Sequence, residues 1–250
     1  MWKTVDIPKG QWYRWTLNGA DFFLLREEIS WKSAVAPIPF YRAQSGLSGP
    51  VESEAPVIQS RCIQKQASAI TLQPHPSQKP YIVTLREELH IPAGAAILLS
   101  ADIPFMLKVE SNNGVLMTNV SPWITADTWF GENTMSGMIC HCIPHSLHIA
   151  TPTQAKSGWL RCICSLKNNS KHIFIVPPLM LPLSQTGVYE YNGQLCSDTV
   201  AFEFSGTDLE LSTIQPPNSY DRTLVSGQKS DKVNMIIRQG ADFIKNITRL

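Results

Sequence analysis

The chain has no excess of charge of either sign. Its 250 residues include 21 lysines and arginines and 20 aspartates and glutamates, which gives a formal net charge of +1. Nucleic acids attract proteins whose positive charges are clustered, and no window of this sequence is both strongly basic and rich in aromatic residues. The charge balance therefore predicts a protein that does not bind nucleic acid.

Two kinds of apolar segment are also missing from the sequence. The N-terminus, MWKTVDIPKG, lacks the apolar stretch of a secretory signal. The longest apolar run, HIFIVPPLMLPL, is too short to span a bilayer and contains three prolines. We therefore expect a soluble, cytoplasmic protein that does not insert directly into a membrane.

Cysteine is scarce. Six cysteines in 250 residues are too few for a disulfide framework, so we expect free thiols. Two segments, MICHCIPHSLHIA and WLRCICSL, each contain a C-x-C pair. Structural zinc sites usually need C-x₂₋₄-C, because two thiolates must reach one tetrahedral centre from a turn. The spacing favours free cysteines buried in a core and no cofactor. A zinc site is the alternative, with these ligands: Cys140, Cys142, Cys162 and Cys164.

Motifs for catalysis are absent from the sequence. There is no G-x-S-x-G elbow, no H-E-x-x-H, no phosphate-binding glycine loop and no dinucleotide fingerprint. His141, His145 and His148 would share a face of a helix, but Pro144 and the strand-like flanks argue against that helix. Enzymatic activity is left open, and a non-enzymatic protein is favoured.

What the chain does have is many short segments with a period of two. They are rich in β-branched and aromatic residues and are separated by turns such as KNNS and YNG. Eighteen prolines fit strand ends and sheet edges better than helices. The pattern predicts an all-β protein with two β-sandwich-like halves: an N-terminal domain at 1–117, a C-terminal domain at 118–214, and a linker with a helix at 215–250.

Three segments outside these strands have their own predictions. Residues 37–56 and 212–230 read as a long loop and a linker. Residues 231–250 predict an amphipathic helix, because Asp231 suits an N-cap and apolar residues recur at three- and four-residue spacing. That helix either docks on its own sheet or joins a partner or a second copy.

The segment ADTWFGENTMSGMIC, residues 126–140, carries a resemblance. It resembles a D-T-W-F-G-x-x-T-x-x-G-x-x-C run in bacterial proteins of the domain-of-unknown-function family 432, and further similarity covers most of residues 10–215. His141 and Cys142 depart from that family's pattern. The family has no assigned activity, but its genes often lie near those of small-conductance mechanosensitive channels. The resemblance therefore implies a membrane channel as one partner to consider.

The D-T-W-F-G segment can also be interpreted physically. Adjacent strand residues face opposite sides, so either Trp129 or Phe130 enters the core while the other faces outward. One interpretation is a packed corner that joins two β-halves. The other is a recognition surface, with Trp129 or Phe130 as an aromatic anchor and three polar contacts at Asp127, Asn133 and Thr134.

The functional prediction is a soluble, non-enzymatic binding or regulatory protein, associated with a mechanosensitive channel or another protein. The alternative is a ligand- or carbohydrate-binding β-sandwich, which could act as a hydrolase with its site under residues 37–56. The sequence leaves a homo-oligomer open.

Overall fold

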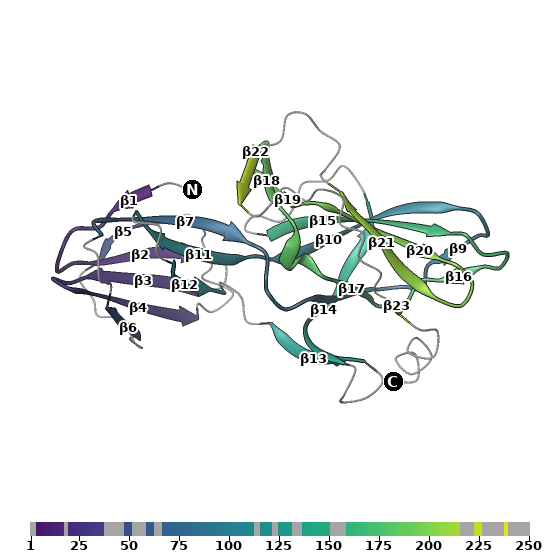
Figure 1. Cartoon of the computed structure of the whole chain (residues 1–250), viewed down its shortest axis with the longest axis horizontal. Coiled ribbons are helices and arrows are strands. Elements are labelled where there is room, and N and C mark those ends of the chain that lie inside the picture. Colours follow the sequence, from purple (N-terminus) through teal and green to yellow (C-terminus); the bar gives the residue numbers. More distant parts are fainter. Residues whose placement is uncertain are drawn as a thin grey trace. The chain divides into compact units, whose positions relative to one another are not determined.

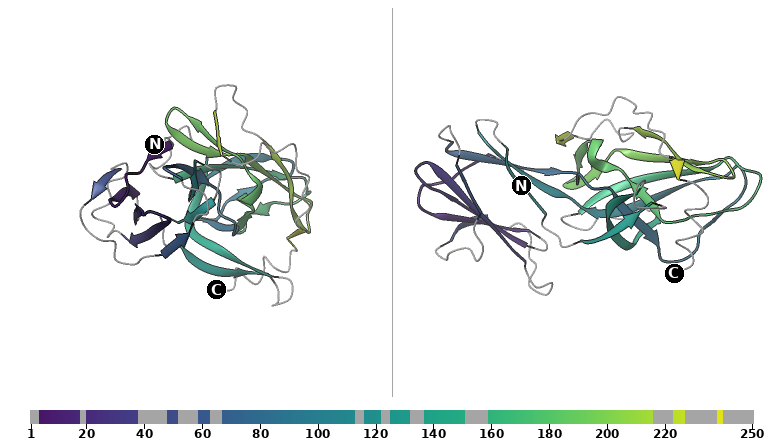
Figure 2. Two further views of the ribbon diagram at one scale, coloured as in Figure 1. Left: turned by 60° about the vertical axis from the view of Figure 1, so that its left-hand side comes forward. Right: turned by 60° about the horizontal axis from the view of Figure 1, so that its bottom comes forward.

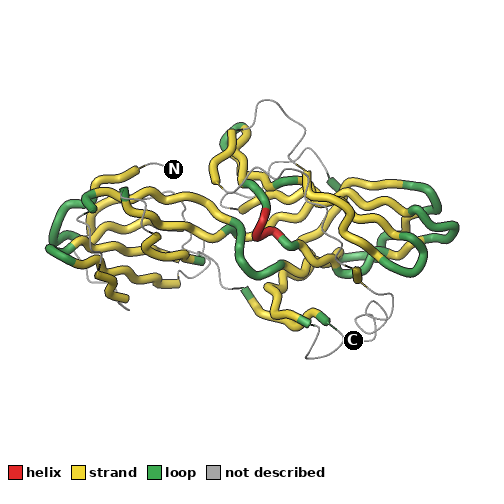
Figure 3. The backbone as a smooth tube through the Cα atoms, viewed as in Figure 1, coloured by secondary structure: helices red, strands yellow, loops and turns green. Residues whose placement is uncertain are grey.

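The structure is a computed structural model in which nearly every regular element of the described residues is a strand (Figures 1 and 3). It describes residues 4–17, 20–37, 48–51, 59–62, 67–112, 116–121, 125–131, 137–150, 159–215, 223–226 and 238–239. The one helical turn in these ranges is the 3₁₀ segment η2 (Leu183–Gln185). Within the same ranges, no helix has the length and apolar character needed to cross a membrane. The predicted all-β class is confirmed.

The chain forms two compact units, each made from two separate stretches. Unit 1 comprises Met1–His75 and Pro104–Ile124, and unit 2 comprises Pro76–Ile103 and Thr125–Leu250. The sequence prediction had a single join between residues 117 and 118. In the structure, the stretch from Pro76 to Ile103 lies instead in the same unit as the C-terminal half of the chain.

Unit 1 consists of two sheets in a sandwich-like arrangement (Figure 2). The first sheet has four strands, in the order β1 (Thr4–Asp6), β7 (Ala69–His75), β11 (Met106–Ser111) and β12 (Leu116–Val120). The second has five strands, in the order β5 (Ser48–Val51), β2 (Trp12–Leu17), β3 (Ala20–Arg26), β4 (Ser30–Pro37) and β6 (Gln59–Cys62).

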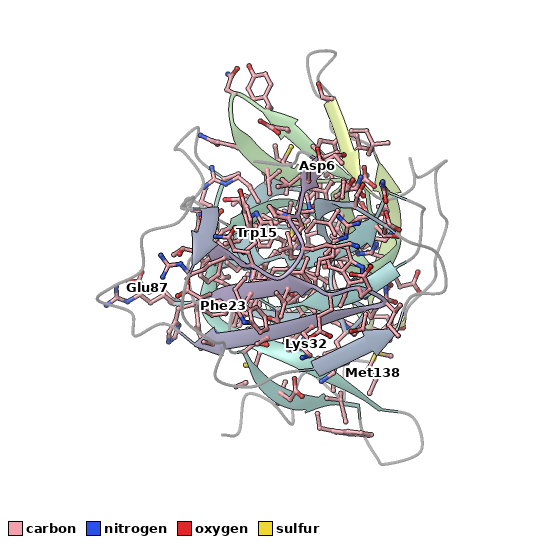
Figure 4. All side chains as sticks on the ribbon, turned by 90° about the vertical axis from the view of Figure 1, so that its left-hand side faces the viewer. Asp6, Trp15, Phe23, Lys32, Glu87 and Met138 are labelled. Carbon is pink, nitrogen blue, oxygen red and sulfur yellow. The ribbon has the colours of Figure 1, made fainter. Side chains whose placement is uncertain are left out.

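Aromatic side chains of β2 and β3 are buried on both faces of the five-stranded sheet. Trp15 lies opposite Phe22, with ring centroids 5.6 Å apart, and both side chains are buried. On the other face, Trp12, Phe23 and Ala34 form a separate apolar cluster (Figure 4 labels Trp15 and Phe23). Because successive strand residues point to opposite faces, the run of apolar residues in β3 serves both clusters.

Unit 2 is built on a twelve-stranded sheet. Its main path runs in the order β17 (Leu179–Leu181), β8 (Tyr81–Leu85), β14 (Met138–Ile149), β10 (Ala96–Pro104), β15 (Trp159–Asn168), β19 (Gln194–Ser197), β18 (Val188–Tyr191) and β22 (Thr223–Ser226). The remaining strands join at its sides: β13 (Ala126–Phe130), β20 (Thr199–Phe204), β21 (Leu209–Gln215) and β23 (Arg238–Gln239). A small ribbon pairs β9 (His90–Ile91) with β16 (Phe174–Ile175).

The C-x-C pair of β15 lies in the core of unit 2. Every second residue of this strand is fully buried, namely Leu160, Cys162, Cys164 and Leu166. Arg161 faces the other way, as the period of two predicts. The predicted burial of these two cysteines is therefore confirmed, and their thiols serve as small apolar groups.

A predicted turn is also confirmed, between β18 and β19. Asn192 and Gly193 connect the two strands and both have positive φ, at 49° and 73°. Two such residues in a two-residue hairpin are typical of a type I′ turn, for which Asn-Gly is the preferred sequence. The register of β18 against β19 follows from this turn.

The segments predicted as irregular contain short strands. Within 37–56, β5 pairs with β2, and within 212–230, β21 continues to Gln215 and β22 pairs with β18. Of the predicted helix at 231–250, only Arg238 and Gln239 are described, and they form β23 against β21. A helix at these two residues is therefore wrong, and the rest of that prediction lies outside the described residues.

Candidate functional site

The D-T-W-F-G segment forms a two-stranded ribbon at one side of unit 2. β13 pairs antiparallel with the first five residues of β14, from Ala126 opposite Cys142 to Phe130 opposite Met138. On the other edge of β14, β8 begins to pair only at His141. Within the described chain, the end of the ribbon is thus held by β13 and β14 alone, and β13 is drawn at the lower side of unit 2 in Figure 1.

The two aromatic residues of the segment face opposite sides of the ribbon. Phe130 is 9% exposed and packs in a cluster with Ile82, Cys140 and Met180. Trp129 is 47% exposed on the other face. The predicted alternation is confirmed, with Phe130 as the residue that enters the core. Phe130 therefore anchors the ribbon, while Trp129 is presented to its surroundings.

The outer end of the ribbon gathers three exposed apolar side chains. Trp129 lies directly opposite Ile139, which is 53% exposed, on one face of the ribbon. Met138 (labelled in Figure 4) lies opposite Phe130 and is exposed on the other face. Gly137 lies under the indole, because a Cβ at this position would be 2.4 Å from the Trp129 ring. Since no side chain fits there, the glycine of the motif lets the ring lie close to the backbone.

A polar network extends along the ribbon on the face that carries Trp129 and Ile139. Asp127 lies opposite His141, and its Oδ1 is 3.0 Å from His141 Nδ1. Lys79 Nζ donates to Asp127 Oδ2 at 2.7 Å. Thr125 Oγ1 is 2.9 Å from the same imidazole nitrogen, and the Tyr81 and His141 ring centroids are 5.1 Å apart. The face thus pairs an apolar end with a hydrogen-bonded charged end.

The charges in this network are set by its hydrogen bonds and by burial. The hydrogen bond from Lys79 lowers the pKa of Asp127, so this side chain is a carboxylate at neutral pH. Burial lowers the pKa of His141, although its contact with Asp127 opposes that effect. The imidazole is therefore neutral at pH 7, and because a carboxylate only accepts, Nδ1 carries the proton that faces Asp127. Burial raises the pKa of Tyr81 to about 12, which keeps its hydroxyl protonated.

The cysteines do not converge on a metal site in the described structure. Cys140 and Cys142 lie on β14 and Cys162 and Cys164 lie on β15, and β10 runs between these two strands. Two strand spacings amount to roughly 9–10 Å, which is too far for four thiolates around one zinc. Within the described residues, no group of three or more histidines, cysteines, aspartates or glutamates could hold a metal ion.

The Cys140 thiol is also unsuited to act as a nucleophile. Burial, with a smaller contribution from the Asp127 charge, raises its pKa to about 11. The thiol therefore stays protonated at neutral pH, whereas the thiolate is the reactive form. The hydrogen bond to Cys162 and burial likewise raise the pKa of Cys164.

A second charged contact lies in the interior of unit 2. Arg161 on β15 donates from Nε to Asp102 Oδ1 on β10 at 3.0 Å, and the two side chains are only 12% and 9% exposed. Ser100, two residues before Asp102, is buried as well. Because this pair joins two neighbouring strands, its evident role is to connect them.

Several residues of the predicted sites lie outside the described ranges. Asn133 and Thr134 lie outside the described residues. So does most of the segment 37–56, under which the alternative ligand site was predicted. Conversely, sequence reasoning missed Lys79 and Tyr81, which precede and begin β8 and reach the site only because β8 pairs in parallel with β14. No local spacing in the sequence marks that pairing.

Comparison with known proteins gives a family and nothing finer. A family model described as "Protein of unknown function (DUF432)" matches residues 1–235 of the chain. Neither the curated proteins nor the solved structures contain a match.

Proposed function

The chain belongs to the DUF432 family of proteins of unknown function, and on that premise we propose that it is a non-enzymatic protein that binds another protein through the β13–β14 ribbon. The contact surface is the face formed by Asp127, Trp129, Ile139 and His141, which we call the ribbon face. The observation that carries the proposal is the exposure of Trp129 within the motif by which the sequence resembles its family.

An exposed tryptophan on a firmly held strand suits a protein interface. Tryptophan is enriched among the few residues that supply most of the binding energy in such interfaces. Here Phe130 packs in the core beneath the strand, and the Gly137 backbone lies close to the indole ring. The ring is therefore pre-organised, and less conformational entropy is lost when a partner covers it.

The polar end of the ribbon face supports specificity. Lys79 and Asp127 form an ion pair with both side chains nearly half exposed. Such a rim pair adds little affinity, but it restricts which charges a partner can place opposite it. The site therefore combines an apolar anchor with a charged border, as the centre and rim of many interfaces do.

The partner that the family resemblance suggests is a small-conductance mechanosensitive channel. This more specific part of the proposal is supported only by gene neighbourhood in the family. The coarser claim, that the ribbon face binds a protein, is independent of it. Both parts are tested by one capture experiment.

In this experiment, the tagged chain is recovered from its native cells in mild detergent and the co-purifying proteins are identified. The parent is compared with Trp129→Asp and with Ile173→Asp as a matched control, because Ile173 is 64% exposed in the same unit and lies outside the ribbon. Circular dichroism and thermal unfolding first establish that both variants are folded.

We expect one or more proteins to be enriched with the parent and with Ile173→Asp, and lost with Trp129→Asp. A tryptophan anchor of this kind is worth about 2 kcal/mol or more, so the loss of affinity should be at least roughly 30-fold. Equal recovery by a folded Trp129→Asp variant would refute binding through the ribbon face. Enrichment of proteins other than a channel subunit would refute the channel alone.

A further inference from the structure

One hydrogen bond of β14 shows in which direction the backbone N–H and C=O groups of β14 and β13 point. The N–H of His141 donates to the carbonyl oxygen of Pro80 at 2.9 Å, on the side of β14 that faces β8. The N–H and C=O of one strand residue point to the same edge, and residues two positions apart share that edge. The backbone groups of His141 and Ile139 therefore point away from β13.

The residues opposite them on β13 must then point away from β14. Asp127 lies opposite His141 and Trp129 lies opposite Ile139. In an antiparallel ladder, such non-hydrogen-bonded pairs direct their N–H and C=O groups to the two outer edges. Asp127 and Trp129 thus present two donors and two acceptors along the outer edge of β13, where the described part of the chain places no further strand.

A strand with the sequence ADTWF can pair with a second copy of itself across a two-fold axis. When the axis passes through Thr128, Asp127 of one copy lies opposite Trp129 of the other, and Ala126 lies opposite Phe130. The outward-pointing residues then form two hydrogen-bonded pairs, each of which exchanges two backbone hydrogen bonds. Thr128 lies opposite itself in a non-hydrogen-bonded pair.

Charge favours this register over the one with its axis at Asp127. An axis through Asp127 would place two carboxylates directly opposite each other, which is destabilising. With the axis at Thr128, each Asp127–Lys79 ion pair instead lies beside Trp129 of the other copy. A lysine ammonium next to an indole face is an attractive arrangement.

We infer that the outer edge of β13 pairs antiparallel with β13 of a second copy of this chain, with the two-fold axis at Thr128. The two ribbon faces then become one continuous surface, in which each Trp129 is bordered by the ion pair of the other copy. Among the described residues no further strand covers this edge, and a strand edge without a partner is a strong template for pairing with another chain. The inference goes beyond the proposed function, because it concerns the edge of the ribbon rather than its exposed face.

The first test is a disulfide across the axis. Residues in a non-hydrogen-bonded pair have Cα atoms about 4.5 Å apart, which is within the range of a disulfide. Thr128→Cys is made in a Cys140→Ala background, because Cys140 lies opposite Thr128 in the same chain and would compete for the new thiol. Thr207→Cys in that background is the control, since Thr207 is exposed in a turn of the same unit.

Under mild oxidation, we expect Thr128→Cys to give a covalent dimer of twice 27.9 kDa on a non-reducing gel. The Thr207→Cys control and the Cys140→Ala background should give little of it. Cross-linking of Thr128→Cys that is no faster than that of Thr207→Cys would overturn the register.

The second test measures the mass of the uncross-linked protein. Light scattering over roughly 1 to 100 µM should give a dimer for the parent. It should give a monomer for folded Thr128→Lys, because two ammonium groups would then face each other at the axis. Thr207→Lys should remain dimeric. A parent that is monomeric throughout, or a Thr128→Lys variant that stays dimeric, would overturn the inference.

The two proposals fail separately. Thr128→Lys leaves Trp129 in place on each monomer, so capture of a partner by this variant tests the ribbon face without the dimer. Loss of dimerisation with retained capture would uphold both the dimer edge and the function. Trp129→Ala places no carboxylate opposite Asp127 of the other copy, so a dimeric Trp129→Ala variant with lost capture would locate partner binding on the face alone.

Discussion

His141 shows how one side chain of the ribbon face couples its ionisation to folding. Its imidazole is largely covered, and burial lowers its pKa below the ordinary value of 6.5 despite the nearby Asp127 carboxylate. The unfolded chain therefore binds this proton more readily than the folded chain. Stability that depends on His141 is present above pH 6.5 and is lost as the pH falls below it.

We expect His141→Gln to weaken this pH dependence. The amide does not titrate and can still donate to Asp127, so the variant should lose less stability than the parent between pH 7.5 and pH 5.5. Urea midpoints at the two pH values provide the measurement, with His90→Gln as a control because His90 is exposed on the small β9–β16 ribbon. A parent and a His141→Gln variant with parallel pH profiles would contradict the assignment.

At the scale of elements, a nearly buried charge pair joins β10 to β15. Arg161 and Asp102 satisfy each other where both are nearly covered. Removal of one partner leaves an uncompensated charge in a poorly hydrated environment, which typically costs about 3–5 kcal/mol. Replacement of both by apolar residues of similar size removes that penalty.

The corresponding prediction compares a single with a double substitution. Arg161→Met should lower the free energy of unfolding by about 3–5 kcal/mol, and Arg161→Met with Asp102→Leu should recover most of that loss. Denaturant unfolding at neutral pH measures both. If the double variant were as unstable as the single one, the loss would come from packing rather than from the unpaired carboxylate.

Elements were also the level at which the sequence was most informative. The period of two predicted strands such as β15, the C-x-C spacing predicted its buried thiols, and Asn192–Gly193 predicted a hairpin, because each of these signals is local. The helix prediction over 231–250 used local periodicity too, but at Arg238 and Gln239 pairing with β21 prevails. A short pattern does not reveal which distant strand is available.

The sequence predicted only those parts of the candidate site that depend on local strand geometry. The opposite orientation of Trp129 and Phe130 follows from strand geometry, so the sequence predicted that one would be exposed. Lys79 reaches Asp127 only through the parallel pairing of β8 with β14, which joins residues about sixty positions apart. A contact of that range leaves no trace in a single sequence.

At the scale of the whole molecule, each unit has its own core. Phe22 is fully buried in unit 1, and Leu160 is fully buried in unit 2. Truncation of either side chain to alanine removes a large apolar contact and should cost about 2–5 kcal/mol within its own unit.

Calorimetry should therefore resolve the two units. We expect two unfolding transitions, with Phe22→Ala lowering the midpoint of one and Leu160→Ala lowering that of the other. A single transition that both substitutions shift equally would mean that the units unfold as one cooperative body.

The interleaved order of the two units has a consequence for synthesis on the ribosome. When residue 103 has been made, unit 1 still lacks β11 and β12, and unit 2 consists only of β8, β9 and β10. One edge of β7 remains unpaired until β11 has been synthesised, and both edges of β10 remain unpaired until β14 and β15 have been synthesised. Nascent chains of this length therefore expose unpaired strand edges, which are prone to aggregate and are natural substrates for chaperones. A chain that ends anywhere between residues 76 and 103 therefore contains neither unit in full.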